Sequence, residues 1–137
     1  MKFNIGVQDQ LPMRLLRYGL AILMLIHGVA RLYYGTISDF GSFLEQQGFP
    51  IGNVIAWGIT LLELIGTVLL VLNFQVRYIA VWFIFQLIMG VVLVHFKEGW
   101  FVVGAGRNGM EYSVLLIIGF VAIAWNDMLH SGSRWKP

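Results

Sequence analysis

Five ionisable side chains that could carry chemistry lie in or beside apolar stretches of this chain, where a charge is costly unless it is compensated. Glu63 stands inside the run GITLLELIGTVLL, and His27 and Arg31 stand four residues apart near the end of an earlier apolar run. His95 ends a third run and Glu111 begins a fourth. Guanidinium, imidazole and carboxylate groups together supply hydrogen-bond donors and a proton acceptor. These five residues are therefore the candidates for a polar ligand site.

The composition shows which solvent surrounds these residues. Hydrophobic residues make up 58% of the 137-residue chain and charged residues only 12%, whereas soluble domains carry about 25% charged residues. The mean hydropathy is +0.78. These values predict a membrane protein. The net charge is only +2 and no basic patch is visible, so we do not expect nucleic acid as a partner.

The chain has no cysteine. Disulfides, thiolate nucleophiles, cysteine-ligated zinc, iron–sulfur clusters and c-type haem are therefore excluded. His27 and His95 lie on the same side of the expected membrane and in principle suit a b-type haem or a metal ion. Two histidines without a further ligand set are weak evidence, so we expect no metal and no intrinsic cofactor.

The apolar runs predict an all-α fold, an integral membrane bundle of four transmembrane helices in a single domain over residues 1–137. The expected spans cover about 13–34, 54–72, 78–95 and 110–125. Each is close to the 17–25 residues that cross a hydrocarbon core about 30 Å thick. The runs lack the alternation of strands, so helices are expected. A short interfacial helix is expected at about 39–47 in the first outer loop, ended by Gly48 before Pro50.

The distribution of lysine and arginine predicts the topology. Six of these residues fall on the side of the two termini and the middle loop, namely Lys2, Arg14, Arg17, Arg77, Arg134 and Lys136. Three fall on the opposite side, namely Arg31, Lys97 and Arg107. The positive-inside rule then places both termini in the cytoplasm. The first loop and the loop of residues 96–109 would face outward.

Glu63 lies about nine residues from each end of its expected span, near the membrane midplane by helix rise. An ionisable group there is costly unless it is paired, neutral or in a wet cavity. His27 and Arg31 share one helix face, and the first two spans form a hairpin. We therefore predict an Arg31–Glu63 ion pair with His27 beside it. Two alternatives stay open: a protonated Glu63 that only locks neighbouring helices, and an Arg31 that reaches for the outer headgroups.

The sequence gives weaker evidence for the roles of the other polar residues. Nine residues of a straight α-helix rotate by about 180°, so His95 and Gln86 are not expected to face one pocket, and His95 is preferred. Its alternative role is that of an interfacial histidine. Glu111 follows Asn108 by three residues, which predicts a capping box. Capping does not stop Glu111 from lining the mouth of a pocket.

Small and polar residues are also expected at helix ends and helix contacts. Asn53 is predicted to cap the second span and Asn73 to end it. Four glycines are predicted to allow close contact between helices: Gly58, Gly66, Gly90 and Gly119.

These motifs occur in an order that resembles the DoxX family of small four-helix bacterial membrane proteins. The motifs are Arg14 and Arg17, Leu25-Ile26-His27-Gly28, Arg31-Leu32, Gly48-Phe49-Pro50, Glu63 with Gly66, Arg77, His95-Phe96 with Gly99, and Asn108-Gly109-Met110-Glu111. The resemblance covers about residues 12–126. Many members have lysine where this chain has Arg31, which keeps the charge but changes its geometry.

The resemblance implies a place in the bacterial inner membrane and an association with membrane redox chemistry, since the family name comes from a subunit of a quinol-linked oxidase. We expect an accessory or quinone-binding subunit with a polar pocket that opens outward. If a reaction is catalysed, we expect a component of a quinone-linked oxidoreductase. A quinone is then the cofactor that would bind. The expected pocket residues are Glu63, Arg31, His27, Glu111 and His95.

Two alternative functions stay open. The first is a binding or transport protein for a small lipophilic metabolite, in which Gln86 would matter. The second is a non-catalytic partner that stabilises or assembles other membrane proteins, with its polar residues satisfied by one another. The expected partners are the lipid bilayer, subunits of a redox complex and further copies of the chain.

Overall fold

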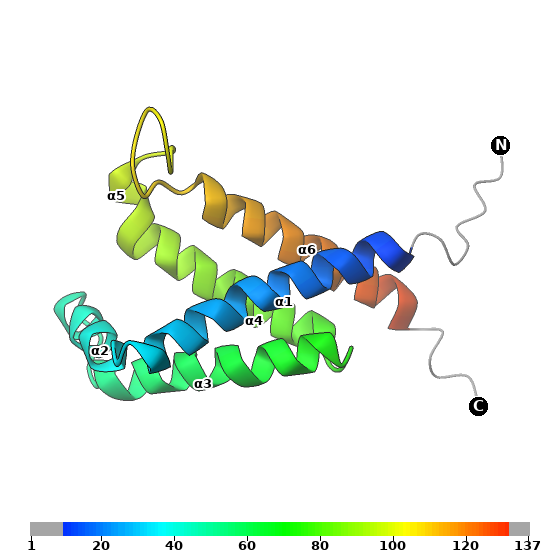
Figure 1. Ribbon diagram of the computed structural model, residues 1–137, viewed down its shortest axis with the longest axis horizontal. Coiled ribbons are helices and arrows are strands. Elements are labelled where there is room, and N and C mark those ends of the chain that lie inside the picture. The colour runs from blue at the N-terminus through cyan, green and yellow to red at the C-terminus, as the bar shows by residue number, and fades with distance from the viewer. Residues whose placement is uncertain (1–9, 132–137) are drawn as a thin grey trace. The chain divides into compact units, whose positions relative to one another are not determined.

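The structure, a computed structural model, describes residues 10–131, and every regular element in that range is a helix (Figure 1). The elements are α1 (Gln10–Tyr33), α2 (Ile37–Gln46), α3 (Gly52–Val71), α4 (Val76–Gly90), the π-helix η2 (Val91–His95), α5 (Phe96–Glu98) and α6 (Glu111–Ser131). The predicted all-α class is confirmed. Lys2, Arg134 and Lys136 from the topology count lie outside the described residues.

Four helical stretches are long and apolar enough to cross a membrane, as predicted. They cover Leu11–Tyr33, Gly52–Val71, Val76–Glu98 and Glu111–His130. A helix of 20 residues is about 30 Å long, and the four stretches have 20 to 23 residues. The third and fourth are longer than predicted, because the helical run continues through polar residues at its end. The short helix predicted in the first loop is α2, which begins at Ile37.

Three helices end in the same way, with one residue in the left-handed conformation. Gly35, Gly48 and Asn73 follow α1, α2 and α3 with φ angles of 67°, 92° and 58°. After α3, the Asn73 N–H donates to the Leu70 carbonyl at 3.1 Å and the Phe74 N–H donates to the Leu69 carbonyl at 2.9 Å. This is the Schellman pattern, in which the last carbonyls of a helix find donors. The predicted stops at Gly48 and Asn73 are confirmed.

The predicted cap at Asn53 is wrong. The helix α3 begins one residue earlier, at Gly52, and Ile51 precedes it with a φ of 59°. The start of α3 is held by its contact with α2 rather than by a capping side chain. A Cβ atom at Gly52 would stand 2.2 Å from the Gly41 carbonyl oxygen, and one at Gly41 would stand 2.7 Å from the Asn53 Cα. Only glycine fits at either position.

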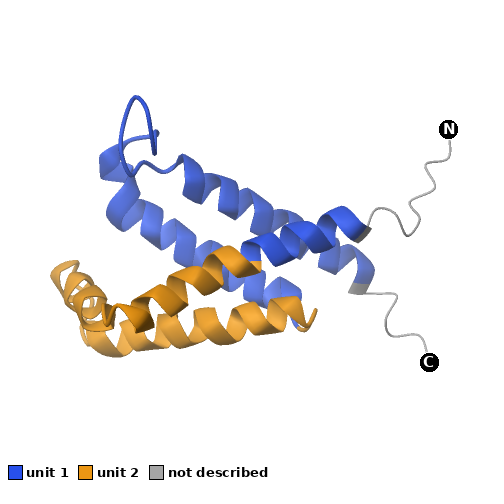
Figure 2. Cartoon of the chain, viewed as in Figure 1, with its two compact units in different colours: residues 1–20, 75–137 blue, residues 21–74 orange. Residues whose placement is uncertain are grey.

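The chain forms two compact units (Figure 2). Unit 1 contains residues 1–20 and 75–137, and unit 2 contains residues 21–74. The continuous helix α1 contributes its first half to unit 1 and its second half to unit 2. Each unit therefore has its own packing and its own polar residues.

In unit 1, α4 packs along α6 through aromatic rings. Phe83 and Phe120 are fully buried, and their ring centroids lie 5.1 Å apart. Gly119 lies close to Leu20, whose Cδ2 would be 3.1 Å from a Cβ at that glycine. The close contact predicted for Gly119 is confirmed. Within residues 10–131, in contrast, Gly58 and Gly90 have no such neighbour within 4 Å, so the close contacts predicted for these two are not confirmed.

The third membrane-crossing stretch is not a regular α-helix throughout. Residues Val91–His95 form the π-helix η2 between α4 and α5. Because π-helical bonds join residues i and i+5, this segment turns less per residue than an α-helix. The assumption of a straight helix between Gln86 and His95 is therefore not met, and the separation of these two side chains stays a prediction.

The glycine contact between α2 and α3 makes a first prediction. We expect Gly52→Ala to lower the free energy of unfolding by about 1–3 kcal/mol, because the added methyl overpacks the contact with Gly41. Gly58→Ala is the matched control in the same helix. It faces open space and should be neutral or should stabilise by up to about 1 kcal/mol. Denaturant unfolding of both variants in detergent measures the difference, and equal effects would contradict this packing.

Candidate functional site

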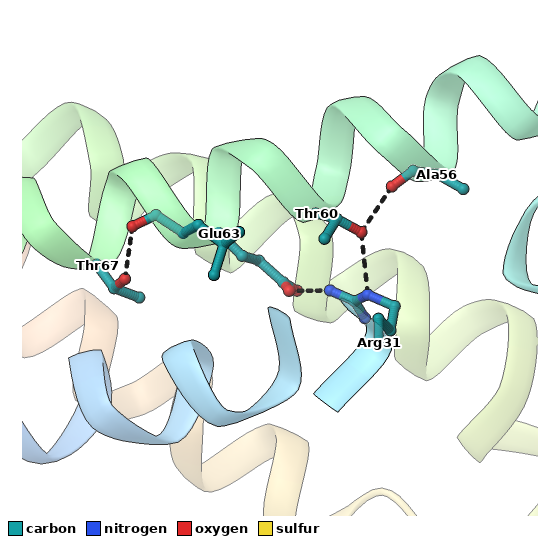
Figure 3. Close-up of polar contacts among 6 residues, drawn as sticks. Arg31, Ala56, Thr60, Glu63 and Thr67 are labelled. Carbon is teal, nitrogen blue, oxygen red and sulfur yellow. Dashed lines mark hydrogen bonds and ion pairs between the residues drawn. The ribbon is translucent and has the colours of Figure 1, made fainter. Parts of the chain in front are cut away.

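The predicted Arg31–Glu63 ion pair is confirmed, and it lies within unit 2. The Nη2 atom of Arg31, near the end of α1, donates to the Oε2 atom of Glu63 on α3 (Figure 3). The Arg31 Nε–H also donates to the Thr60 hydroxyl at 3.2 Å. The Glu63 side chain is 1% exposed and the Arg31 side chain is 20% exposed. The carboxylate is thus enclosed, while part of the guanidinium reaches the surface.

Glu63 belongs to a buried polar stripe on α3. Thr60, Glu63 and Thr67 are spaced by three and four residues, so they share one helix face, and all three are buried. The Thr60 hydroxyl donates to the Ala56 carbonyl at 2.8 Å, and the Thr67 hydroxyl donates to the Leu64 carbonyl at 2.9 Å. Apolar residues such as Leu61 and Ile65 are exposed on the rest of the helix. The Glu63 carboxylate, which interrupts the apolar run of residues 58–70, therefore points into the protein.

Two further contacts hold Arg31 in place, and a glycine lets α3 approach it. Its Cζ atom lies 5.3 Å from the centre of the Phe40 ring on α2, which suits a cation–π interaction. Its backbone carbonyl accepts the Thr36 N–H at 3.0 Å, where α1 ends. Gly28, one turn earlier, lets α3 approach, since a Cβ there would stand 3.3 Å from the Glu63 Oε2 atom. The guanidinium is therefore fixed by α1, α2 and α3 together.

The bonds of Arg31 leave part of the guanidinium available. An arginine side chain has five N–H donors, and the bonds to Glu63 and Thr60 use one N–H on Nη2 and the N–H on Nε. Among the residues that the structure describes, no hydrogen bond engages Nη1. Since the side chain is partly exposed, these donors can meet a hydrogen-bond acceptor from outside the chain.

His27 lies on α1, one turn before Arg31, and its side chain is exposed. It is therefore outside the enclosed cluster, on the surface of unit 2. A neutral imidazole can donate one hydrogen bond and accept another. His27 would thus be available to a ligand that approaches Arg31 from the surface of α1.

His95 belongs to unit 1 and is engaged with the loop that follows α5. Its Nδ1 atom lies 2.8 Å from the Asn108 carbonyl oxygen. Because a carbonyl only accepts hydrogen bonds, Nδ1 carries the proton and Nε2 of the neutral ring is an acceptor. The φ of Asn108 is 58°, so this residue is held in a turn that presents its carbonyl to His95.

Glu111 holds the same loop from its other end. Its Oε1 atom accepts the Val102 N–H at 2.8 Å, and its own N–H donates to the Trp100 carbonyl at 3.0 Å. The predicted capping box with Asn108 is wrong, because α6 begins at Glu111 itself. The carboxylate binds a loop residue nine positions earlier instead of the helix start.

The structure thus divides the five predicted site residues. It brings together Arg31 and Glu63, places His27 one turn away on α1, and assigns His95 and Glu111 to the loop of unit 1. A single pocket lined by all five stays a prediction. Two residues of the unit 2 cluster were missed, Thr60 and Phe40. Thr60 carries a sequence signal, since it is polar and three residues before Glu63, whereas the contact of Phe40 depends on how α2 folds back.

The comparison with known families concerns the part of the chain that contains this cluster. The model of the DoxX family matches residues 13–96, more than half of the chain. The chain belongs to the DoxX family. It is a multi-pass membrane protein of that family. No curated protein and no solved structure matched the chain.

The family match is shorter than the resemblance noted in the sequence. It includes His27, Arg31, Glu63 and His95 but ends before Glu111 and the fourth membrane-crossing helix. The DoxX match therefore covers the whole of the ion-pair cluster, while the loop contact of Glu111 lies beyond it.

The ion pair makes a second prediction. We expect Arg31→Met and Glu63→Met each to lower the free energy of unfolding by roughly 3–5 kcal/mol, because each leaves a buried charge without its partner. The double variant should be close to wild type, since two apolar side chains of similar length replace the pair. Denaturant unfolding of the four proteins gives the coupling energy. Additive losses would show that the two side chains do not interact.

The loop contact makes a third prediction. We expect Glu111→Ala to speed hydrogen exchange at the Val102 amide by about fivefold, since the loss of one hydrogen bond corresponds to about 1 kcal/mol. Glu111→Gln is the matched control, because its amide oxygen can still accept the Val102 N–H. Exchange measured by NMR or mass spectrometry separates the two. Equal protection in both variants would contradict the contact.

Proposed function

We propose that this DoxX protein binds a quinone at Arg31 and acts as an accessory or quinone-binding subunit of a membrane redox system. The observation that carries the proposal is the guanidinium of Arg31, which is fixed by Glu63 and Thr60 and still has N–H donors at the surface. A quinone carbonyl is an acceptor that fits these donors. The surrounding helices are apolar, which suits a quinone because quinones dissolve in lipid.

The charge balance of the cluster supports a neutral ligand. Glu63 compensates Arg31, so the cluster has no net charge and offers hydrogen bonds rather than charge attraction. An anionic ligand would compete with Glu63 for the guanidinium, whereas a neutral carbonyl can bind the remaining donors and leave the pair intact. His27, one turn away on α1 and exposed, would serve a second carbonyl of the same ring.

The membrane orientation is part of the proposal. The lysine and arginine count favours cytoplasmic termini in a bacterial inner membrane. Arg31, near the end of α1, would then lie toward the outer side of the membrane. The ligand site would be reached from the outer half of the bilayer.

A second candidate function is favoured by the contacts that Arg31 and Glu63 already make within the protein. Glu63, Thr60 and Phe40 all engage Arg31 within the same unit, as expected of a cluster that only stabilises the fold. In that case the protein would serve as an assembly partner of other membrane proteins, and the surface donors of Arg31 would have no role.

Native mass spectrometry of gently solubilised full-length protein tests the proposal. We expect the wild type to carry a discrete mass of a quinone and Glu63→Ala to lose about tenfold or more of its occupancy, because Arg31 is no longer held. Arg77→Ala is the control, since Arg77 is an arginine at the start of another helix, α4, and should keep the ligand.

Two outcomes would contradict the proposal. A wild type without a bound mass, or with another polypeptide only, would favour the assembly function. A bound lipophilic mass that is not a quinone would favour transport or binding of another metabolite. The Arg31→Met/Glu63→Met variant shows whether loss of ligand follows from loss of Arg31 rather than from misfolding, because it should stay folded and still bind no quinone.

A further inference from the structure

We propose that the closed loop between α5 and α6 anchors unit 1 in the interfacial layer of the bilayer, with the lipid headgroups as its partner. The loop covers residues 99–110, where α5 ends and α6 begins (Figure 1). The anchor is independent of the proposed quinone site, because the loop belongs to unit 1 and Arg31 to unit 2.

Backbone hydrogen bonds close this loop into a fixed shape. Three consecutive N–H groups, those of residues 109–111, donate to the three carbonyls of residues 99–101 at 3.0 to 3.1 Å. The two side-chain bonds described above hold the same loop. Gly109 is packed against this ladder, since a Cβ there would stand 2.5 Å from the Trp100 carbonyl oxygen. The loop is therefore ordered by folding, so a partner that binds it meets a preformed surface.

The closed loop and the residue before α5 continues hold large apolar side chains at the surface. Phe96, Trp100, Phe101 and Val103 are exposed by 68%, 48%, 47% and 77%. The carbonyls of Trp100 and Phe101 are bonded to residues of the other loop end, so these two rings cannot leave the surface without breaking the ladder. A contiguous apolar surface of this kind marks contact with a membrane or with another protein.

The ends of the membrane-crossing helices place Trp100 at the membrane boundary. The third membrane-crossing stretch ends at Glu98 and the fourth begins at Glu111. Trp100 is two residues beyond Glu98, at most about 7 Å of extended chain, and its carbonyl accepts the Glu111 N–H at 3.0 Å. The interfacial layer is about 5–8 Å thick on each side of the hydrocarbon core. The backbone of Trp100 therefore lies within this layer.

The residue types of the loop favour lipid over a protein partner. Tryptophan is enriched at membrane interfaces because its ring is apolar and its N–H is polar. Residues 96–110 also contain two cations, Lys97 and Arg107, and one acid, Glu98. A headgroup layer offers an apolar surface to the rings, hydrogen-bond acceptors to the Trp100 N–H and phosphates to the two cations. Such an anchor fixes the depth at which α6 begins in the membrane.

Spin labels measure this depth directly, and the chain has no cysteine, so each single-cysteine variant carries one label. The experiment is power-saturation EPR of the full-length protein, one copy in each phosphatidylcholine nanodisc, with oxygen and a water-soluble nickel complex as relaxation agents. We expect the label of Phe101→Cys to lie within about 8 Å outside the hydrocarbon boundary. Ile118→Cys is the matched control. Ile118 is exposed on α6, two turns after its start, and its label should report hydrocarbon.

A second variant tests whether the closed loop sets the depth. Gly109→Ala places a methyl group against the Trp100 carbonyl and should open the ladder. The label at position 101 should then move toward water and become more accessible to the nickel complex, while the label at position 118 keeps its depth and shows that α6 stays folded.

The possible results separate lipid from the alternatives. An interfacial label at position 101 that moves toward water in Gly109→Ala supports the anchor. A label as accessible to nickel as a free label in water overturns the anchor. A label that neither agent reaches also overturns it, because the patch would then be covered by protein. An equal depth with and without Gly109→Ala overturns the role of the closed loop, since the apolar side chains alone would then set the depth.

Discussion

A carboxylate buried in a membrane-crossing helix is the constraint on which unit 2 depends. Glu63 on α3 can be ionised there only if a cation lies beside it, and Arg31 on α1 supplies that cation. The remaining contacts of unit 2 follow from this requirement. Gly28 lets the helices approach at the carboxylate, and Phe40 on α2 covers the guanidinium. The tight contact of α2 with α3 keeps Phe40 there.

Unit 1 uses its polar residues for a different purpose. His95 and Glu111 both bind backbone groups of the loop between α5 and α6, and the buried rings of Phe83 and Phe120 join α4 to α6. His95 and Glu111, residue types that also occur in or beside the unit 2 cluster, thus hold the loop that connects two membrane-crossing helices. Residue type alone does not separate these two roles.

Much of the fold and the central pair could be predicted from local patterns. Apolar runs of sufficient length define the spans, left-handed turns at Gly48 and Asn73 end two helices, and the hairpin of the first two spans brings Arg31 to Glu63. The missed features depend on packing between elements. The loop contact of Glu111 and the start of α3 at Gly52 each depend on a residue of another segment, Val102 and Gly41 respectively. Helix propensities and capping motifs depend on the local sequence, so they do not reveal such contacts between elements.

Solid-state NMR of the protein in bilayers, with labels in the Arg31 guanidinium and the Glu63 carboxyl, can show directly whether the buried pair is ionised. We expect the carbon shift of an ionised carboxylate and a nitrogen-to-oxygen separation within about 4 Å, the range of an ion pair. Added ubiquinone-1 should shift the Nη1 resonance of Arg31 and leave Nε, which is bound to Thr60, nearly unchanged. A protonated carboxyl that is remote from the guanidinium would contradict the ion pair and the ligand site proposed at Arg31.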